Sequence, residues 1–465
     1  MRKFMKSISV AFIAQIVSLL VSVFMSFFVS KFMSVEMYGY YQLFLFCTTY
    51  VGIFQLGISE GNYLENGGKS LSTINKGDLK NQFLSISILQ IAILGVLFVV
   101  LNIMEPDTNK LTAYTFAILY SIAHLWVMYF GLTLQAINET EKYSIAIIAG
   151  KLITLILFFI AVIVKRDEFV TYSLIYLIGY IISGLIVMFY GKDIILNRTK
   201  FSFNLLEHKK TIIAGSSLLF ATLISSFIIG INRIYIELFL GIEEFGRVSM
   251  SLSLSNFLVL FAIQFGMVMF PSIISLSDQK QREIYTALNA LTPYLVPIIM
   301  LAYIPLAFIL QRWLPNYTDS IHWILLFIPY IVYEIKNQII LYTYIKIHRE
   351  EKYMLKVNII TFVACGIINL LIMLTLKNIV LVFIVLNVVL IIKSILLEMK
   401  VNQILEMKRQ RISIIEACIC MAATLVMYYA PSQIYIVFVI ILYAAFFCVQ
   451  RRENQFVNIS ALRKI

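Results

Sequence analysis

Residues 32–39 read FMSVEMYG, and residues 239–246 read FLGIEEFG. The two stretches lie 207 positions apart, and each one separates two long hydrophobic segments. A second echo follows in the same order, with Gln55-Leu56-Gly57 near the end of one hydrophobic segment and Gln264-Phe265-Gly266 near the end of its counterpart. Two ordered matches, at offsets of 207 and 209, indicate an internal repeat. The alternative is a shared turn signal, in which Glu and then Gly close a short hairpin.

The composition excludes a soluble globular chain. The chain has 465 residues, of which 61% are hydrophobic and 13% charged, and its mean hydropathy is +0.90, whereas soluble domains carry about 25% charged residues. A membrane-spanning helix needs about 20 apolar residues. Fourteen stretches qualify: 7–30, 39–60, 83–103, 111–134, 145–164, 170–190, 211–238, 248–274, 287–310, 321–344, 355–376, 378–397, 412–430 and 433–449. We therefore expect an all-α integral membrane protein with about fourteen transmembrane helices. Twelve spans and an interfacial hairpin are the alternative, because the last two stretches are short and nearly continuous.

The repeat and the spans together predict the domain organisation. The second copy begins at the seventh span, so each copy holds six spans and both copies have the same orientation, related by an axis along the membrane normal. We expect an N-terminal six-helix bundle over residues 1–205 and a C-terminal six-helix bundle over 206–399. Two extra helices and a cytoplasmic tail follow over 400–465. Such a parallel repeat favours a transporter with a cavity between two bundles.

The distribution of basic residues predicts the orientation. With the N-terminus inside, 25 Lys and Arg residues fall on inner segments and 8 on outer ones. This bias matches the positive-inside rule and places both termini in the cytoplasm. It also accounts for the net charge of +12 without nucleic acid as a partner. The first hydrophobic stretch is long enough to span and lacks a small-residue cleavage site, so it is expected to be a retained helix rather than a signal peptide.

The motifs of common enzymes are absent from the sequence. The outer loops are short, and no HExxH, GxSxG or Cys-x-x-Cys motif occurs. The Gly67-Gly68-Lys69-Ser70 stretch fails as a phosphate-binding loop, because the glycine needed five residues before Gly68 would fall on position 63, which is Tyr63. The cysteines lie in apolar stretches and the four histidines are scattered. We expect no enzymatic activity, no cofactor and no metal centre.

Ionisable side chains at membrane depth cost about 2.5–3.5 kcal/mol each, so they usually face a bundle interior or a wet cavity. The candidates for a cationic cavity that binds a diphosphate are Arg233, Lys336, Lys151 and Lys393. The candidates for a coupling-ion or sugar contact are Glu334, Asn337, Gln338 and Gln264. Glu334 falls near the midplane of its span, and Asn337 and Gln338 share its helical face.

Each of these side chains also has a purely structural interpretation. Glu334 can pair with one of the cations between helices, and Arg233 can pair with Glu237 one turn on. Lys151 and Lys393 can extend to the inner interface, and the glutamines can join helices by hydrogen bonds. The sequence leaves these alternatives open.

The N-terminal half resembles a known transporter family. The residues that carry the resemblance are the turn Glu36-Met37-Tyr38-Gly39, the inner segment GISEGNYLENGGK at 57–69, and Asn232-Arg233 followed by Phe239-Leu240-Gly241. They resemble the polysaccharide biosynthesis transporters, the O-antigen and capsule repeat-unit flippases of the multidrug/oligosaccharidyl-lipid/polysaccharide exporter superfamily. Relatives commonly have Asp before the arginine, where this chain has Asn232. The resemblance covers essentially the whole length and implies a MATE-like pair of six-helix bundles with two extra C-terminal helices.

The resemblance also implies a function. The substrate would be an undecaprenyl-diphosphate-linked oligosaccharide, moved by alternating access from the inner to the outer leaflet of a bacterial cytoplasmic membrane for surface polysaccharide synthesis. Membrane lipids, a polysaccharide polymerase and glycosyltransferases would be its partners. Two alternatives stay open, namely a drug or cation antiporter of the same superfamily and a membrane-embedded polymerase or acyltransferase.

Overall fold

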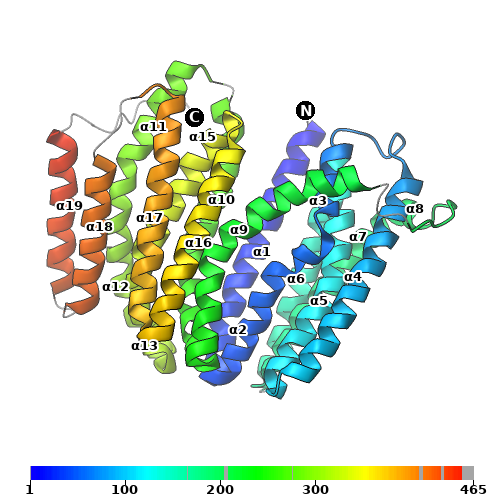
Figure 1. Cartoon of the computed structure of the whole chain (residues 1–465), viewed down its shortest axis with the longest axis horizontal. Coiled ribbons are helices and arrows are strands. Elements are labelled where there is room, and N and C mark those ends of the chain that lie inside the picture. Colours follow the sequence, from blue (N-terminus) through cyan, green and yellow to red (C-terminus); the bar gives the residue numbers. More distant parts are fainter. Residues whose placement is uncertain are drawn as a thin grey trace. The chain divides into compact units, whose positions relative to one another are not determined.

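The computed structural model describes residues 2–164, 166–203, 208–274, 276–407, 412–430 and 434–452. Its regular elements within these ranges are all helices, with no strand (Figure 1). The first nine α-helices are α1 (Arg2–Phe32), α2 (Val35–Tyr50), α3 (Ile58–Asn66), α4 (Lys76–Met104), α5 (Thr108–Ala136), α6 (Thr140–Ile163), α7 (Phe169–Tyr190), α8 (Lys192–Ile195) and α9 (Lys209–Leu240). The others are α10 (Ile242–Ile274), α11 (Asp278–Leu291), α12 (Leu295–Trp313), α13 (Thr318–Trp323), α14 (Ile328–Lys336), α15 (Tyr342–Ile347), α16 (Glu351–Thr375), α17 (Ile379–Ile404), α18 (Ile412–Tyr429) and α19 (Tyr435–Arg452). Short 3-10 turns are η1 (Val51–Gln55), η2 (Thr292–Tyr294), η3 (Pro315–Tyr317) and η4 (Ile324–Phe327), and η5 (Asn337–Leu341) is a π-helical turn.

Many of these helices are long and apolar enough to cross a membrane. Within the described ranges there are ten such segments, or eleven if α2 with η1 and the bent α3 count as one span. Helices α18 and α19 are apolar but shorter. The prediction of an all-α, multi-pass membrane protein is confirmed. The count of fourteen spans stays a prediction.

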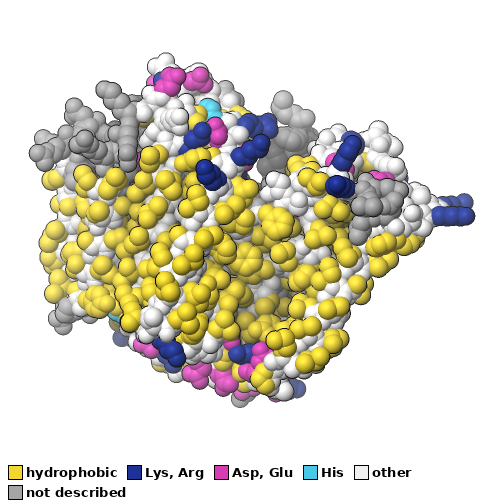
Figure 2. All heavy atoms as spheres, in the orientation of Figure 1, with side chains coloured by type: hydrophobic (Ala, Val, Ile, Leu, Met, Phe, Trp, Pro, Cys, Tyr) yellow, Lys and Arg dark blue, Asp and Glu magenta, His cyan; other side chains and the backbone are white. Residues whose placement is uncertain are grey.

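The outer surface of the helices is apolar. Ile103 and Ile163 are each 79% exposed and Val96 is 66% exposed, which in water would be unfavourable for so many large side chains. Figure 2 shows hydrophobic side chains over the middle of the helices and most of the Lys, Arg, Asp and Glu side chains toward the helix ends. This pattern fits helices whose outer faces contact lipid.

Polar side chains fix the beginnings of several helices. Ser34 Oγ accepts from the Met37 backbone N–H at 3.2 Å, at the start of α2. Asp107 caps α5, and Asn75 and Asn378 cap α4 and α17. Such caps satisfy backbone N–H groups that have no partner within the helix. The turn after α1, which belongs to the repeated stretch at residues 32–39, is therefore a helix-capping signal.

Two compact units make up the chain, Met1–Leu223 and Ile224–Ile465. In the first unit, α5 packs against α2, α3 and α7, while α6 packs against both α7 and α1. A hydrophobic core of this unit includes Ile58, Ile86, Tyr129, Phe130 and Val187, all fully buried. The predicted domain boundaries at 205/206 and 399/400 stay predictions.

The second unit has the broken helix series α13–α15 at its centre. Helix α14 packs against α10, α12, α17 and α18, and α16 packs against α17. Helix α19 packs on α12. The core includes Ile273, Tyr285, Leu341, Tyr344 and Leu397. Proline marks two of the helix breaks in this unit, with Pro293 in η2 and Pro329 in the first turn of α14, as expected from the missing N–H of proline.

The second sequence echo has two different structures. In the first unit the chain bends by 60° between Val35–Gln55 and Ile58–Asn66, because Leu56 and Gly57 have left-handed backbones with φ of +52° and +77°. In the second unit Gly266 lies inside α10, which continues to Ile274. Only glycine adopts the left-handed conformation without strain, so Leu56 is the strained residue of this break.

Candidate functional site

A lysine without a carboxylate partner lies inside the first unit. Lys151 is near the middle of α6, and its Nζ donates to Ser22 Oγ on α1 at 3.2 Å. The same ammonium lies 5.0 Å from the centre of the Tyr176 ring on α7. Lys151 makes no ion pair with any residue that the structure describes. The side chain therefore points to α1 and α7 rather than to the inner interface.

Aromatic rings extend from Lys151 across α7 and α5. Tyr120 lies 5.9 Å from Tyr176 and 4.4 Å from Tyr180, measured between ring centroids. His124 stacks on Tyr180 at 6.0 Å, and its Nδ1 accepts from Gln55 Nε2 at 2.6 Å. The Tyr176 ring thus lies next to the Lys151 ammonium, and Tyr120, Tyr180 and His124 continue the aromatic contacts from it. Such a set can hydrogen-bond and stack on a sugar, while the ammonium attracts a phosphate.

Two glycines bring α6 and α7 together beside this cluster. Gly150 and Gly179 face each other across the helix crossing, and a Cβ on Gly150 would collide with Ser183 Oγ, whereas a Cβ on Gly179 would collide with Thr154 Oγ1. Small residues permit this close approach of two membrane helices. A small pocket lies at the crossing, and Lys151, Tyr176 and Tyr180 are among the residues that line it. We call Lys151, Tyr176 and Tyr180 the Lys151 pocket; Tyr120, His124 and Gln55 lie beyond its lining and contact it through Tyr180 and His124.

The predicted polar face of Glu334 is present in the second unit. Gln338 Nε2 donates to Glu334 Oε1 at 2.8 Å, and Asn337 Nδ2 lies 3.4 Å from Glu334 Oε2. These contacts span the junction of α14 with the π-helical turn η5. Tyr330, one turn earlier, donates its hydroxyl to Asn256 Oδ1 on α10. The contacts of this polar face are therefore made by amide groups and a hydroxyl.

Lys336 is committed to a buried ion pair. Its Nζ lies 2.8 Å from Glu398 Oε2 on α17, and both side chains are at most 5% exposed. The sequence left open an ion pair between Glu334 and one of the cations, but the partner of Lys336 is Glu398. Because its charge is already neutralised, Lys336 is poorly placed to bind a diphosphate.

Lys393 is buried in the same unit. Its side chain is 1% exposed, and Nζ lies 3.4 Å from Ser225 Oγ and 5.5 Å from the centre of the Tyr342 ring. It also interacts electrostatically with Glu334. Lys393 therefore does not extend to an interface, and it lies in the same charged region as Glu334.

The remaining two candidates lie elsewhere. Arg233 Nη2 donates to Ser249 Oγ at 2.7 Å, and its guanidinium carbon lies 4.8 Å from the centre of the Phe245 ring. Gln264 belongs to α10, but its side chain falls outside the part of the chain that the structure describes. The structure thus gathers Glu334, Lys336, Lys393, Asn337 and Gln338 around α14 and α17, and places Lys151 in the other unit.

Sequence reasoning missed several residues of these clusters. The sequence singled out none of the tyrosines around Lys151, and Glu398 falls just outside its predicted span at 378–397. Asn232, which stands where relatives commonly have Asp, accepts from Asn369 Nδ2 at 2.6 Å in a neutral buried contact. The spacing of Tyr176 and Tyr180 by one helical turn, on a segment with small residues opposite Lys151, is the signal that could have identified the pocket.

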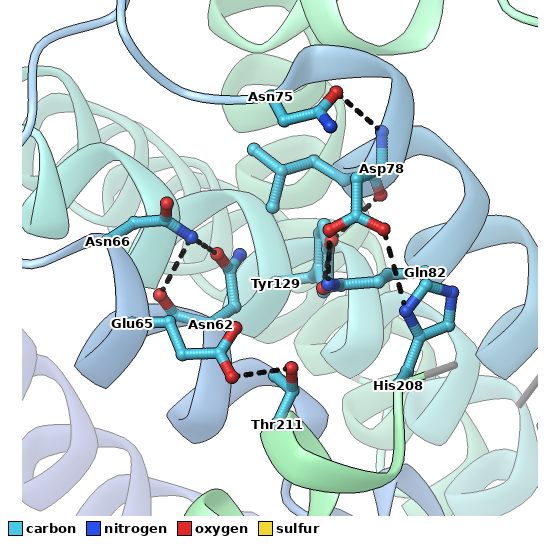
Figure 3. Close-up of polar contacts among 10 residues, drawn as sticks. Asn62, Glu65, Asn66, Asn75, Asp78, Gln82, Tyr129, His208 and Thr211 are labelled. Atoms are coloured by element: carbon cyan, nitrogen blue, oxygen red, sulfur yellow. Dashed lines mark hydrogen bonds and ion pairs between the residues drawn. The ribbon is translucent and has the colours of Figure 1, made fainter. Parts of the chain in front are cut away.

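A separate polar network holds the start of α9 to α3 and α4 (Figure 3). Thr211 Oγ1 donates to Glu65 Oε1 at 2.8 Å, and His208 Nδ1 lies 3.6 Å from Asp78 Oδ1. Asp78 Oδ2 in turn accepts from Gln82 Nε2 at 3.0 Å. These contacts position the first turns of α9 within the first unit.

Comparisons with known proteins identify the fold. No protein-family model matches the chain, and no curated protein matches it in sequence. Among solved structures, the chain is similar to a lipid II flippase, MurJ, in an inward closed conformation. The superposition covers 97% of this chain and 99% of the flippase, with a TM-score of 0.61 and 13% sequence identity. It is also similar to an inward-facing multidrug resistance MATE family transporter of the MOP superfamily. That superposition covers 85% of this chain and 100% of the transporter, with a TM-score of 0.56 and 13% sequence identity. The chain therefore has the fold of transporters of this superfamily.

Proposed function

We propose that the chain is a flippase that moves polyprenyl-diphosphate-linked oligosaccharides across a bacterial cytoplasmic membrane for surface polysaccharide synthesis. The observation that carries the proposal is the likeness to a lipid II flippase along 97% of the chain. The likeness to the multidrug transporter extends over 85% of the chain. A fold shared with a transporter of lipid-linked cargo over nearly the full length favours a cargo of that class.

The Lys151 pocket supplies chemistry that suits such a cargo. Among the described residues, the partners of the Lys151 ammonium are a hydroxyl and a ring, so its charge is available for a phosphate oxygen. The tyrosines offer ring faces and hydroxyl groups for a sugar. A carboxylate next to Lys151 would have cancelled the attraction, and none of the described residues provides one within ion-pair distance.

The orientation and the mechanism form part of the same proposal. The excess of Lys and Arg on the inner segments supports cytoplasmic termini, and the internal repeat supports alternating access by two six-helix halves. The polyprenyl tail would stay in lipid, against the apolar outer surface of the helices, while the polar head crosses. The polymerase and glycosyltransferases of the pathway would be functional partners.

Deletion of the gene in its own host tests this function. The measurement is the amount of surface glycan together with the leaflet in which lipid-linked repeat units accumulate. We expect accumulation in the cytoplasmic leaflet, restored by the wild-type chain and by Lys142→Ala, but not by Lys151→Ala. Lys142 is a matched control because it lies on the same helix, half exposed, in a surface ion pair with Glu139. Normal glycan and normal intermediates would contradict the proposal.

A drug or cation antiporter is the second candidate. The fold likeness to a multidrug transporter and the buried Glu334, which makes no ion pair with any described residue, favour it, because a buried carboxylate can attract a cationic drug. The same deletion strain separates the two. Altered drug susceptibility with normal glycan supports the antiporter, whereas extracellular repeat units that stay unpolymerised indicate a polymerase instead.

A further inference from the structure

Residues 192–203, which comprise α8 and the chain after it in the first unit, expose apolar and basic side chains together. Leu196 is 74% exposed, Phe201 43% and Phe203 53%. Three cationic side chains of the same stretch are exposed as well, those of Lys192, Arg198 and Lys200. Large apolar side chains that gather on a surface and are bordered by charged ones mark an interaction site. We call residues 192–203 the basic-apolar segment.

The inner side of the basic-apolar segment is fixed to the first unit. Ile194 is 2% exposed and belongs to the hydrophobic core of that unit. Lys80 Nζ, on α4, donates to the Asn197 carbonyl oxygen at 2.6 Å. A Cβ on Gly77 of α4 would collide with the Thr199 side chain, so α4 and the segment are closely packed. The segment therefore keeps a defined position, in which its exposed side chains point away from α4.

The sequence of this region carries an excess of positive charge. Residues 191–210 include five Lys and Arg residues and two acidic residues, Asp193 and Glu207. Three positive charges are left over even if both acidic residues pair within this stretch. Asp193 already lies 3.7 Å from Lys76 on α4, and Arg198 and Lys200 make no hydrogen bond or ion pair with any residue that the structure describes. An anionic partner therefore matches the charge of this surface.

The basic-apolar segment also continues a surface that faces lipid. Phe189, in the last turn of α7, is 64% exposed, and Leu185, one turn earlier, is 54% exposed. Lys192 Nζ lies 5.1 Å from the centre of the Phe189 ring, an arrangement typical of the place where a helix leaves the hydrocarbon region. In Figure 1 the chain after α8 protrudes from the edge of the first unit, and Figure 2 shows Lys and Arg side chains at this protrusion, next to apolar surface. The segment thus lies at the height of the lipid headgroups.

We propose that the basic-apolar segment binds the anionic lipid headgroups of the leaflet at this end of the helices. Arg198 and Lys200 contact headgroup phosphates, while the three exposed apolar side chains enter the boundary between headgroups and acyl chains. Segments that lie in the membrane interface combine these two features, and basic side chains next to a spanning helix are attracted to anionic lipids. The surface is separate from the Lys151 pocket, and the proposal does not depend on the cargo.

Tryptophan fluorescence of the full-length protein in vesicles tests this surface. Phe203→Trp places a reporter in the segment, and the wild-type chain with its three tryptophans supplies the background. The vesicles contain phosphatidylcholine and phosphatidylglycerol, and bromine atoms, which quench tryptophan, are placed on the acyl chains of one lipid or of the other. We expect quenching of the reporter by both lipids and stronger quenching when phosphatidylglycerol carries the bromine. The ratio of the two signals gives the preference for the anionic lipid.

Removal of single cations in the Phe203→Trp chain identifies the residues that bind. Arg198→Gln and Lys200→Gln are each expected to lower the preference by about fivefold, because one basic residue near an anionic surface contributes an attraction of that size. Added salt should lower the preference as well, since these charges face water. Lys280→Gln is the matched control, because Lys280 is exposed on α11 of the second unit and its loss changes the net charge by the same amount.

Three results would overturn the proposal. The reporter is not quenched by either lipid, which would mean that the segment lies in water or against another protein; the two lipids quench equally; or Lys280→Gln lowers the preference as much as Arg198→Gln. None of these results affects the flippase proposal, because the vesicles contain no lipid-linked oligosaccharide and Lys151 is unchanged in every variant.

Discussion

The Lys151 ammonium lies 5.0 Å from the centre of the Tyr176 ring, and this contact joins α6 to α7. Among the other candidate lysines, Lys336 is neutralised by Glu398, and Lys393, which contacts Ser225 and the Tyr342 ring, also interacts with the Glu334 carboxylate. Lys151 has a hydroxyl and an aromatic ring as partners, and no described carboxylate lies within ion-pair distance. A cation with neutral partners can exchange them for an anion at little electrostatic cost. Lys151 is therefore the cation best placed to contact a phosphate.

Replacement of Lys151 tests this assignment. Hydrogen bonds to charged groups contribute about 1.5–3 kcal/mol, so Lys151→Ala is expected to lower the flipping rate by about tenfold to a hundredfold. The measurement uses the protein in liposomes with a fluorescent undecaprenyl-diphosphate-linked oligosaccharide and an impermeant quencher. Lys142→Ala should behave as wild type. An equal rate for both variants would show that Lys151 does not contact the cargo.

The role of the Tyr176 ring can be separated from that of its hydroxyl. A cation–π contact contributes about 0.5–2 kcal/mol, and phenylalanine keeps it whereas leucine does not. We expect Tyr176→Phe to retain most of the flipping rate and Tyr176→Leu to lose about twofold to thirtyfold in the same liposome assay. If Tyr176→Phe is as slow as Tyr176→Leu, the hydroxyl rather than the ring is the functional group.

The Lys336–Glu398 pair predicts a non-additive effect on stability. Removal of one member of a buried ion pair leaves an uncompensated charge and destabilises by about 3–5 kcal/mol, whereas removal of both is often nearly neutral. We therefore expect Lys336→Met to lower the unfolding temperature strongly and the double variant Lys336→Met, Glu398→Leu to recover most of the loss. Circular dichroism of the protein in detergent measures the unfolding temperatures of the wild type, Lys336→Met, Glu398→Leu and the double variant. Additive losses would contradict a direct pair.

The sequence predicted the membrane class and the important charges, but not their partners. Amphipathic and apolar stretches are local signals, so the helices lie where the hydrophobic stretches predict them. The partner of Lys151 is Ser22, 129 residues away, and that of Lys336 is Glu398, 62 residues away. Such contacts depend on how helices pack, which no local pattern encodes. The same applies to the two copies of the Gln-x-Gly match, because the chain breaks a helix at Gly57 but continues α10 through Gly266.

The glycines at the crossing of α6 and α7 predict a specific packing defect. A Cβ on Gly150 would collide with Ser183 Oγ and with the Gly179 carbonyl, and overpacking of this kind costs about 1–3 kcal/mol. Gly150→Ala should therefore lower the unfolding temperature in detergent. Gly95→Ala is the matched control, because Gly95 lies in α4 with open space at its Cβ position. A similar temperature for both variants would show that the crossing is looser than described.

The last prediction concerns the helix break after α2. It compares Gly57, which lies at the break, with Gly68, which has a similar backbone conformation. Gly57 and Gly68 have φ of +77° and +81°, so alanine at either position costs about 1–2 kcal/mol in backbone strain. Around Gly68 there is open space, but a Cβ on Gly57 would collide with the backbone of Gly215 and Ser216 in α9.

Because backbone atoms cannot move aside as a flexible side chain can, the collision adds about 1–3 kcal/mol at Gly57 alone. We expect Gly57→Ala to lose more stability than Gly68→Ala in the same unfolding measurement, and to lose flipping activity as well. Equal losses would mean that backbone strain accounts for both, and that α3 and the start of α9 can separate without penalty. A larger loss at Gly57 means that the break after α2 is held in place by its contact with α9.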